Sequence, residues 1–98
     1  MKFIQIIEYT TTKPDEVQAA LDEFLATSGG TRANTWARVT TDRDRPNVYL
    51  NIVEFPSYED AMANSNDPRT GEFAEKMMKL CDGPPTFYNL DVLYDEDM

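Results

Sequence analysis

The sequence contains no histidine and a single cysteine, Cys81, and these two shortages exclude several kinds of site. Without an imidazole there is no Ser-His-Asp triad, no histidine-ligated metal and no proximal histidine for haem. One thiol can neither close an internal disulfide nor hold a zinc ion. Any catalysis therefore has to use carboxylates, tyrosine, arginine, asparagine, lysine, this one cysteine or a cofactor held without histidine.

Basic residues and long apolar runs are also scarce. The chain has 9 Lys and Arg against 18 Asp and Glu, a net charge of −9. The basic residues form no cluster, so we expect no nucleic-acid partner, and the acidic balance disfavours an anionic membrane surface. No apolar run approaches the roughly 20 residues that span a bilayer, and the N-terminus lacks the apolar core of a signal peptide. We therefore expect a cytoplasmic protein with no membrane partner.

The 98 residues fit one domain, residues 1–98, and 41% of them are hydrophobic, enough for a core. Apolar alternation and β-branched residues predict four strands: Phe3–Tyr9, Thr31–Thr41, Val48–Phe55 and Thr86–Tyr94.

Two helical regions are predicted between these strands. The first begins at Pro14 and ends at Ser28-Gly29-Gly30, where a glycine suits the helix cap. The second begins after Ser57, is interrupted at Asn64–Pro68 and stops at Asp82–Pro85. The order β-α-β-β-α-β predicts an α+β, ferredoxin-like fold, with a four-stranded antiparallel sheet and the helices on one of its faces.

The segment from Leu50 onward resembles a known superfamily. Leu50–Phe55 followed by Ser57–Met62 is similar to the third strand and next helix of the dimeric α/β-barrel proteins, and within them to the antibiotic biosynthesis monooxygenase group. The matching positions are Glu54, Ala61 and Phe73.

Two positions depart from the pattern of that group. Pro56 stands where it often has Trp, and Ser65 where it often has His. The resemblance implies a homodimer whose two sheets form a barrel. It also implies either haem degradation, which needs a histidine and is excluded here, or quinol oxidation without a metal or organic cofactor. We therefore expect no cofactor.

The apolar pattern itself supports a homodimer. The first and third strands carry apolar residues on both faces, with Ile4 and Ile6 opposite Phe3 and Ile7. Helices can cover only one face, and a second copy of the chain is the simplest cover for the other.

The most site-like feature is a stripe on the second strand. Asn34, Trp36 and Arg38 share one face, where an indole platform with polar neighbours could bind an aromatic molecule between sheet and helices. Alternatively this face lies at the dimer surface or in solvent, with Trp36 as an interface anchor.

Other polar residues on the strands are further candidates. Asn51 and Tyr49 share a face of the third strand, and the Asn51 amide needs partners that either a ligand or a neighbouring strand can supply. Tyr49 or Tyr88 could relay a proton, or each could simply pack with its hydroxyl at the rim. Glu54, at the end of its strand, could act as a base or cap the next helix.

Three functions remain open at this level. The first is a cofactor-free monooxygenase that oxidises a phenol or quinol, with Arg38 on a substrate oxygen and with Asn34, Trp36 and Asn51 orienting the ring. The second is a non-catalytic homodimer that binds a small molecule. The third is a proton-transfer isomerase or lyase that uses Glu54.

Overall fold

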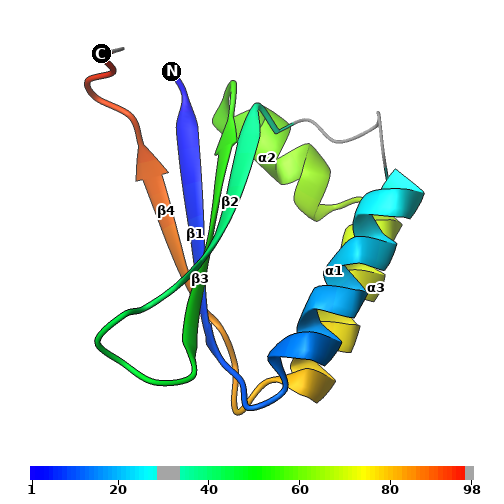
Figure 1. Ribbon diagram of the computed structural model, residues 1–98. Helices are drawn as coiled ribbons and strands as arrows, with labels where there is room; N and C mark the ends of the chain where they lie inside the picture. The colour runs from blue at the N-terminus through cyan, green and yellow to red at the C-terminus, as the bar shows by residue number, and fades with distance from the viewer. Residues whose placement is uncertain (29–33, 97–98) are drawn as a thin grey trace.

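A computed structural model describes residues 1–28 and 34–96, and it confirms the predicted ferredoxin-like α+β fold. The elements along the chain are β1 (Phe3–Thr10), α1 (Pro14–Ser28), β2 (Trp36–Thr41), β3 (Val48–Phe55), α2 (Tyr58–Ser65), α3 (Pro68–Leu80) and β4 (Thr86–Asp91). The sheet has the strand order β2-β3-β1-β4 and every neighbouring pair is antiparallel. All three helices lie on one side of it (Figure 1).

Three strand boundaries differ from the prediction, the first by one residue, since β1 ends at Thr10 instead of Tyr9. β2 begins at Trp36 instead of Thr31, and residues 31–33 and the expected glycine cap at 29 and 30 lie outside the described residues. β4 ends at Asp91 instead of Tyr94. The reason is that β4 pairs only with β1, and Asp91 already lies opposite Phe3, the first residue of that strand.

Side chains alternate along each strand, so the register defines two faces of the sheet. The inner face looks toward the helices and includes Gln5, Ile7, Tyr9, Asn51 and Val53. The outer face carries the remaining positions: Ile4, Ile6 and Glu8 of β1, Leu50, Ile52 and Glu54 of β3, Trp36, Arg38 and Thr40 of β2, and Thr86, Tyr88 and Leu90 of β4.

The predicted interruption of the second helical region is confirmed and has a local cause. Asp67 is the N-cap of α3: its carboxylate accepts a hydrogen bond from the Arg69 backbone N–H at 2.9 Å. Pro68 then occupies the first turn, where its missing N–H costs nothing. Ser57 caps α2 in the same way, accepting from the Asp60 N–H at 3.2 Å. The chain therefore turns between α2 and α3.

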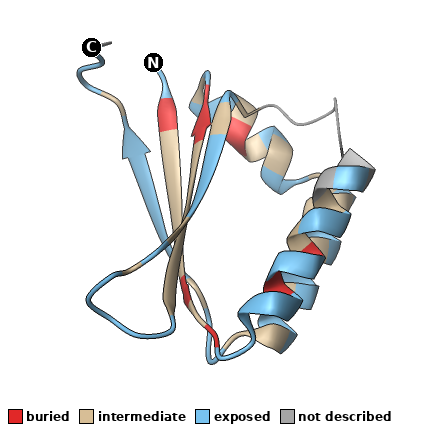
Figure 2. Ribbon diagram, in the orientation of Figure 1, coloured by how far each residue is buried: buried red, intermediate tan, exposed pale blue. Residues whose placement is uncertain are grey.

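The helices meet the sheet mainly at the two ends of the inner face. At one end Phe3, Phe55 and Ala61 form the buried core cluster beneath α2, shown in red in Figure 2. Along the middle, α1 and α3 pack on one another through the stacked rings of Phe24 and Phe73, whose centroids are 4.7 Å apart. Figure 1 shows this helix pair standing away from the sheet. Residues of the sheet, α1 and α3 together line the cavity that forms the candidate site.

A buried hydroxyl group joins the helices to the sheet at the other end of the inner face. Thr11, fully buried after β1, donates a hydrogen bond to the Leu80 carbonyl at 2.6 Å and accepts one from the Lys13 N–H at 3.0 Å. The Asp82 N–H also donates to the Thr10 carbonyl at 2.7 Å. These bonds join the start of α1 and the end of α3 to the same point of the sheet, so they fix the helix pair relative to the inner face.

Candidate functional site

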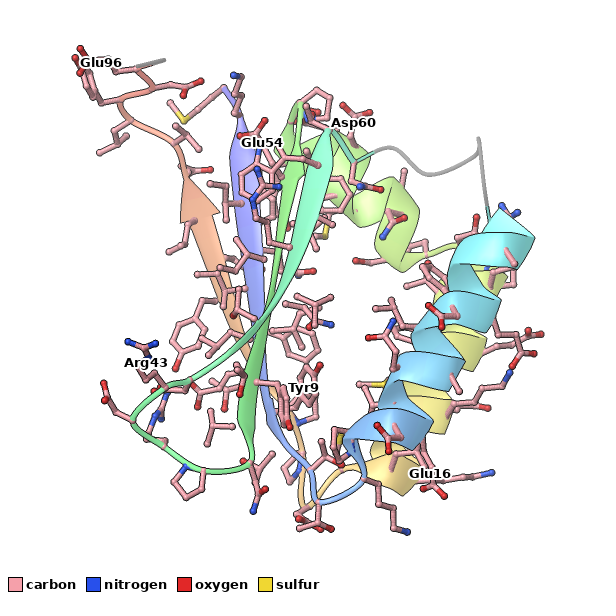
Figure 3. All side chains as sticks on the ribbon, in the orientation of Figure 1. Tyr9, Glu16, Arg43, Glu54, Asp60 and Glu96 are labelled. Carbon is pink, nitrogen blue, oxygen red and sulfur yellow. The ribbon has the colours of Figure 1, made fainter. Side chains whose placement is uncertain are left out.

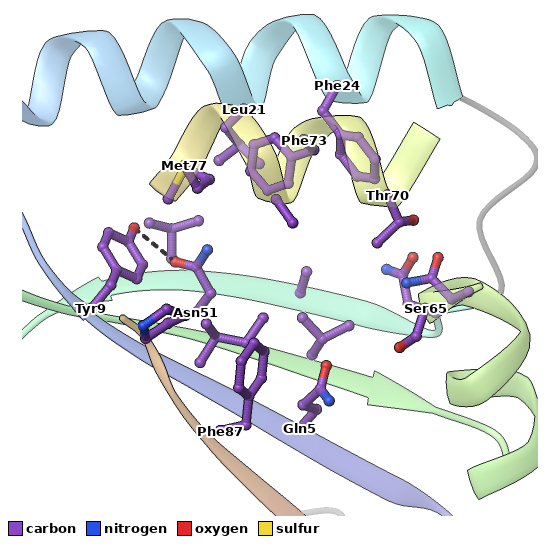
Figure 4. A pocket seen from close by; sticks show the side chains of 18 of the residues that line it. Gln5, Tyr9, Leu21, Phe24, Asn51, Ser65, Thr70, Phe73, Met77 and Phe87 are labelled. Atoms are coloured by element: carbon purple, nitrogen blue, oxygen red, sulfur yellow. Dashed lines mark hydrogen bonds between the residues drawn. The ribbon is translucent and has the colours of Figure 1, made fainter. Parts of the chain in front are cut away.

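A cavity of about 470 Å³ lies between the inner face of the sheet and the α1–α3 pair. Ligand sites for small molecules span roughly 300–1,000 Å³, so this one suits a molecule of two or three rings. Its lining is mostly aliphatic and aromatic: Ile7, Leu21, Phe24, Ala37, Val39, Val53, Phe55, Phe73, Ala74, Met77, Met78, Pro85 and Phe87. Figure 4 shows the sheet as one wall and the helix residues Leu21, Phe24, Phe73 and Met77 as the other.

Tyr9 and Asn51 form the polar group at the end of the cavity near the Thr11 junction. The Tyr9 hydroxyl donates a hydrogen bond to Asn51 Oδ1 at 3.1 Å (Figure 4). The Tyr9 ring is 4% exposed and stacks on Tyr49, with centroids 5.7 Å apart. Burial, together with the nearby Cys81 and Tyr49, raises the pKa of Tyr9 to about 12, because all three disfavour a phenolate. Tyr9 is therefore a neutral hydrogen-bond donor at physiological pH.

A second amide faces the cavity from β1. Gln5 Nε2 donates a hydrogen bond to Asn89 Oδ1 on β4 at 3.2 Å, and Gln5 lines the cavity floor in Figure 4. At the far end, the polar side chains come from the α2–α3 region and include Asn64, Ser65 and Thr70. The cavity is thus an apolar slot with neutral hydrogen-bonding groups on its floor and at both ends.

Among the predicted site residues, Asn51 and Asn34 line this cavity. Asn51 points from β3 into it, as a ligand-binding role requires. Asn34 lies just before β2, at the cavity's edge. The structure therefore brings these two amides to the same cavity, and their role in ligand binding stays a prediction.

Trp36 and Arg38 lie elsewhere. The register puts Trp36 opposite Glu54 and Arg38 opposite Ile52, both on the outer face, which none of the described helices covers. The Arg38 guanidinium sits 4.7 Å from the centroid of the Trp36 ring, a cation–π contact on that face. Arg38 also borders the cavity, but its charged group is occupied on the other side of the sheet. The structure therefore does not bring the Trp36 stripe together as a wall between sheet and helices.

The two candidate proton relays are also separated. Tyr49 is on the inner face but stands behind Tyr9, so it contributes to the site by stacking on that ring. Tyr88 is on the outer face, 42% exposed, and its hydroxyl donates to Glu8 at 3.5 Å. A proton relay through Tyr88 would have to cross the sheet.

Glu54 is buried, with 7% of its surface exposed, but it faces away from the cavity. It pairs in register with Ile4 on one side and Trp36 on the other, all on the outer face. Within the described part of the chain no side chain bonds to its carboxylate. Phe73 lines the cavity from α3, away from Glu54. Figure 3 shows Glu54 and Tyr9 at opposite ends of the sheet.

Sequence reasoning missed Tyr9 and Gln5. Both have the odd-numbered parity of Phe3 and Ile7 on β1, so the alternation could have placed them on one face together. Nothing in the sequence shows that Tyr9 reaches Asn51, because the two are 42 positions apart. Cys81 also lines the cavity, and burial together with Asp82 raises the pKa of its thiol, so it stays protonated.

Residues 1–28 and 34–96 contain neither a metal-binding cluster nor a membrane-spanning helix. No cluster of three or more Cys, Asp or Glu side chains that could hold a metal ion occurs there. In the same residues no helix is long and apolar enough to cross a membrane.

No protein-family model and no curated protein sequence matches the chain, but solved structures do. SnoaB, a cofactor-independent oxygenase from Streptomyces nogalater, matches with a TM-score of 0.80 at 14% identity, over 96% of this chain and 95% of its own. A candidate antibiotic biosynthesis monooxygenase from Caulobacter crescentus matches with a TM-score of 0.83 at 12% identity, over 95% and 91%. Rv0793 from Mycobacterium tuberculosis gives 0.80 at 13%, over 99% and 100%. The chain therefore has, over nearly its whole length, the fold of the antibiotic biosynthesis monooxygenase structures.

Proposed function

We propose that this chain binds a small, neutral, largely aromatic molecule in the cavity between its sheet and its α1–α3 pair. The observation that carries this proposal is the lining: apolar walls of suitable volume, with amide and phenol groups as the polar contacts. Within the described residues no Asp, Glu or Lys lines the cavity, and Arg38 directs its guanidinium to Trp36 on the outer face. A charged ligand would lose its hydration there without gaining a counter-ion.

The reaction that we propose for this site is oxidation of a bound phenol or quinol by molecular oxygen without a cofactor. For a simple phenol, one oxygen atom is inserted into the ring at a C–H position and the other leaves as water. The phenol loses four electrons and becomes a quinone, while O₂ gains the same four. SnoaB, which shares the fold, is a cofactor-independent oxygenase, and this supports the choice.

The chain's own groups would contribute binding and charge stabilisation. The Asn51 amide can donate a hydrogen bond to the substrate oxygen. Such a donor lowers the barrier most when that oxygen gains negative charge in the transition state. The apolar walls hold the ring and exclude water, which strengthens this hydrogen bond. Tyr9 keeps its proton, so it acts on the substrate only through Asn51.

The positions of the cavity and of Glu54 also rank the two alternative functions. A non-catalytic binding protein would need the same cavity and differs only in not consuming oxygen. A proton-transfer isomerase or lyase that uses Glu54 is disfavoured, because this carboxylate is on the outer face with the sheet between it and the cavity.

Oxygen uptake with 1-naphthol separates these functions. We expect the wild-type protein to bind 1-naphthol and to consume one O₂ for each 1,4-naphthoquinone formed. Asn51→Ala removes the donor, and we expect binding to weaken about tenfold and turnover to fall about a hundredfold. Asn66→Ala is the matched control, since it deletes the same atoms at an exposed α2 cap outside the cavity. Binding without oxygen uptake would leave only the non-catalytic function, and no binding would refute the proposal.

The proposal includes a homodimer formed through the outer face. That face presents Ile4, Ile6, Leu50, Ile52 and Leu90, and Figure 1 shows no helix over it. Leu90 and Tyr88 are 44% and 42% exposed in the single chain. An apolar sheet face of this extent is typical of an interface. Face-to-face pairing with a second copy would bury this face and would also cover Glu54, whose carboxylate has no side-chain partner within the described residues.

A further inference from the structure

The two amides on the cavity floor differ in which of their atoms is already engaged. Asn51 uses its oxygen, which accepts from the Tyr9 hydroxyl at 3.1 Å. Gln5 uses its nitrogen, which donates to Asn89 at 3.2 Å. A side-chain amide has one acceptor oxygen and one donor nitrogen, so engaging one of them leaves the other for a ligand.

The orientation of the Asn51 amide follows from the burial of Tyr9. Tyr9 is 4% exposed, and a buried hydroxyl requires an acceptor for its hydrogen. Within the described residues Asn51 Oδ1 is the acceptor that it has. Turning the amide over would present Nδ2 to the hydroxyl and leave the phenolic hydrogen unsatisfied. Tyr9 therefore holds Nδ2 on the cavity side, as Figure 4 shows.

The hydrogen bond to Asn89 gives Gln5 the opposite polarity. Asn89 Oδ1 takes up Gln5 Nε2, so Gln5 Oε1 is the group left for the cavity, and Figure 4 shows that oxygen directed upward from the floor. Gln5 lies opposite Val53, two residues along β3 from Asn51. Such diagonal neighbours on adjacent strands are roughly 7–8 Å apart. The donor and the acceptor are thus about the span of one or two aromatic rings from each other.

We propose that Tyr9 and Asn89 are positioning residues, which fix the Asn51 and Gln5 amides so that the cavity selects a neutral aromatic ligand with a hydrogen-bond acceptor at one end and a donor at the other. A hydroxyaryl ketone or a hydroxyquinone has this pattern. The inference rests on the proposed function, because it assumes that the cavity binds an aromatic molecule. It adds the arrangement of polar groups on that molecule and the two residues that enforce it.

Three naphthalene probes test the selection. 6-Hydroxy-2-acetonaphthone carries a ketone and a hydroxyl at opposite ends, 6-methoxy-2-acetonaphthone lacks the donor, and 2-naphthol lacks the ketone. At a pH where the naphthols are neutral, we expect the first probe to bind about tenfold more tightly than either of the others. Equal affinities for all three would overturn the inference while leaving the proposed function intact. No binding of any probe would refute both.

The positioning role is tested with Tyr9→Phe, which keeps the buried ring and its stack on Tyr49 but removes the hydroxyl. We expect the preference for the ketone probe over 2-naphthol to shrink from about tenfold to about twofold, since the Asn51 amide is then free to turn over. Asn89→Ala should instead remove the preference for the hydroxyl over the methoxy probe. Tyr58→Phe is the matched control, because it deletes the same atom from an exposed ring outside the cavity.

An infrared difference spectrum supplies a readout that a purely structural effect would not change. The ketone stretch of the bound hydroxyketone should be one band, lowered by the Asn51 hydrogen bond. In Tyr9→Phe a second band should appear near the frequency of the ketone in an apolar solvent. A single lowered band in Tyr9→Phe, or an equal loss of affinity for all three probes, would overturn the role given to Tyr9.

Discussion

Replacing Thr11 with valine should strongly destabilise the protein, because the buried hydroxyl links the sheet to both helices that cover the cavity. The side chain is fully buried and makes two hydrogen bonds, to the Leu80 carbonyl at 2.6 Å and from the Lys13 N–H at 3.0 Å. Valine has nearly the same shape, so packing is kept and only the hydroxyl is lost. The effect therefore isolates these two bonds.

The size of this stability loss follows from the two backbone groups that Thr11→Val leaves without a hydrogen-bond partner. Leu80 is the last residue of α3, and Pro84, four residues on, has no N–H to donate to its carbonyl. The Lys13 N–H precedes α1 and loses its acceptor. A buried polar group without a partner costs about 1–3 kcal/mol, and the Lys13 N–H costs less because Lys13 is exposed and water can reach it, so we expect a loss of about 2–4 kcal/mol. For a domain of this size that lowers Tm by about 10–25 °C.

Urea unfolding followed by circular dichroism measures this loss, with an unchanged dependence on denaturant as the sign that the unfolded state is unaltered. Thr12→Val, at the exposed neighbouring position, is the matched control and should change stability by less than about 0.5 kcal/mol. Thr11→Ser keeps the hydroxyl and loses only a methyl group. The reasoning is refuted if Thr11→Val is as stable as the wild type, or if Thr11→Ser costs as much as Thr11→Val.

Two other predictions concern the outer face and the start of α3. Ile52→Asp, or Leu90→Asp at a more exposed position of the outer face, should convert the proposed dimer into a monomer, because each places a charge in the interface. Ala19→Asp, on the exposed side of α1, is the control and should leave the dimer intact. Size exclusion coupled to light scattering measures the mass, and a monomeric wild type would contradict the proposed interface. The hydrogen bonds from Arg69 lower the pKa of Asp67 to about 2 from about 3.8, so this carboxylate contributes stability above pH 3.8 that is lost as the pH falls toward 2. Asp67→Asn keeps the cap oxygen and cannot ionise, so its unfolding free energy should fall less between pH 4 and pH 2 than that of the wild type; parallel curves would exclude this role.

Secondary structure and strand parity were predictable from the sequence for local reasons. The alternation predicts that Tyr49 and Asn51 share a face of β3, and that Trp36 and Arg38 share a face of β2. In the structure each pair does share a face. The break before α3 was predictable from Asp67 and Pro68, because a cap and a proline act within a few residues of themselves.

The tertiary structure decided which face of each strand meets the helices. β1 and β3 are apolar on both sides, so the alternation alone gives no sign of which side is inner, and it left open whether the Trp36 stripe faces the helices or the outside. The Tyr9–Asn51 hydrogen bond likewise depends on the register between two strands, with 42 positions between the residues. The local sequence determines where helices and strands form and which residues share a face of a strand. The long-range pairing of the strands determines which of those residues form the candidate site.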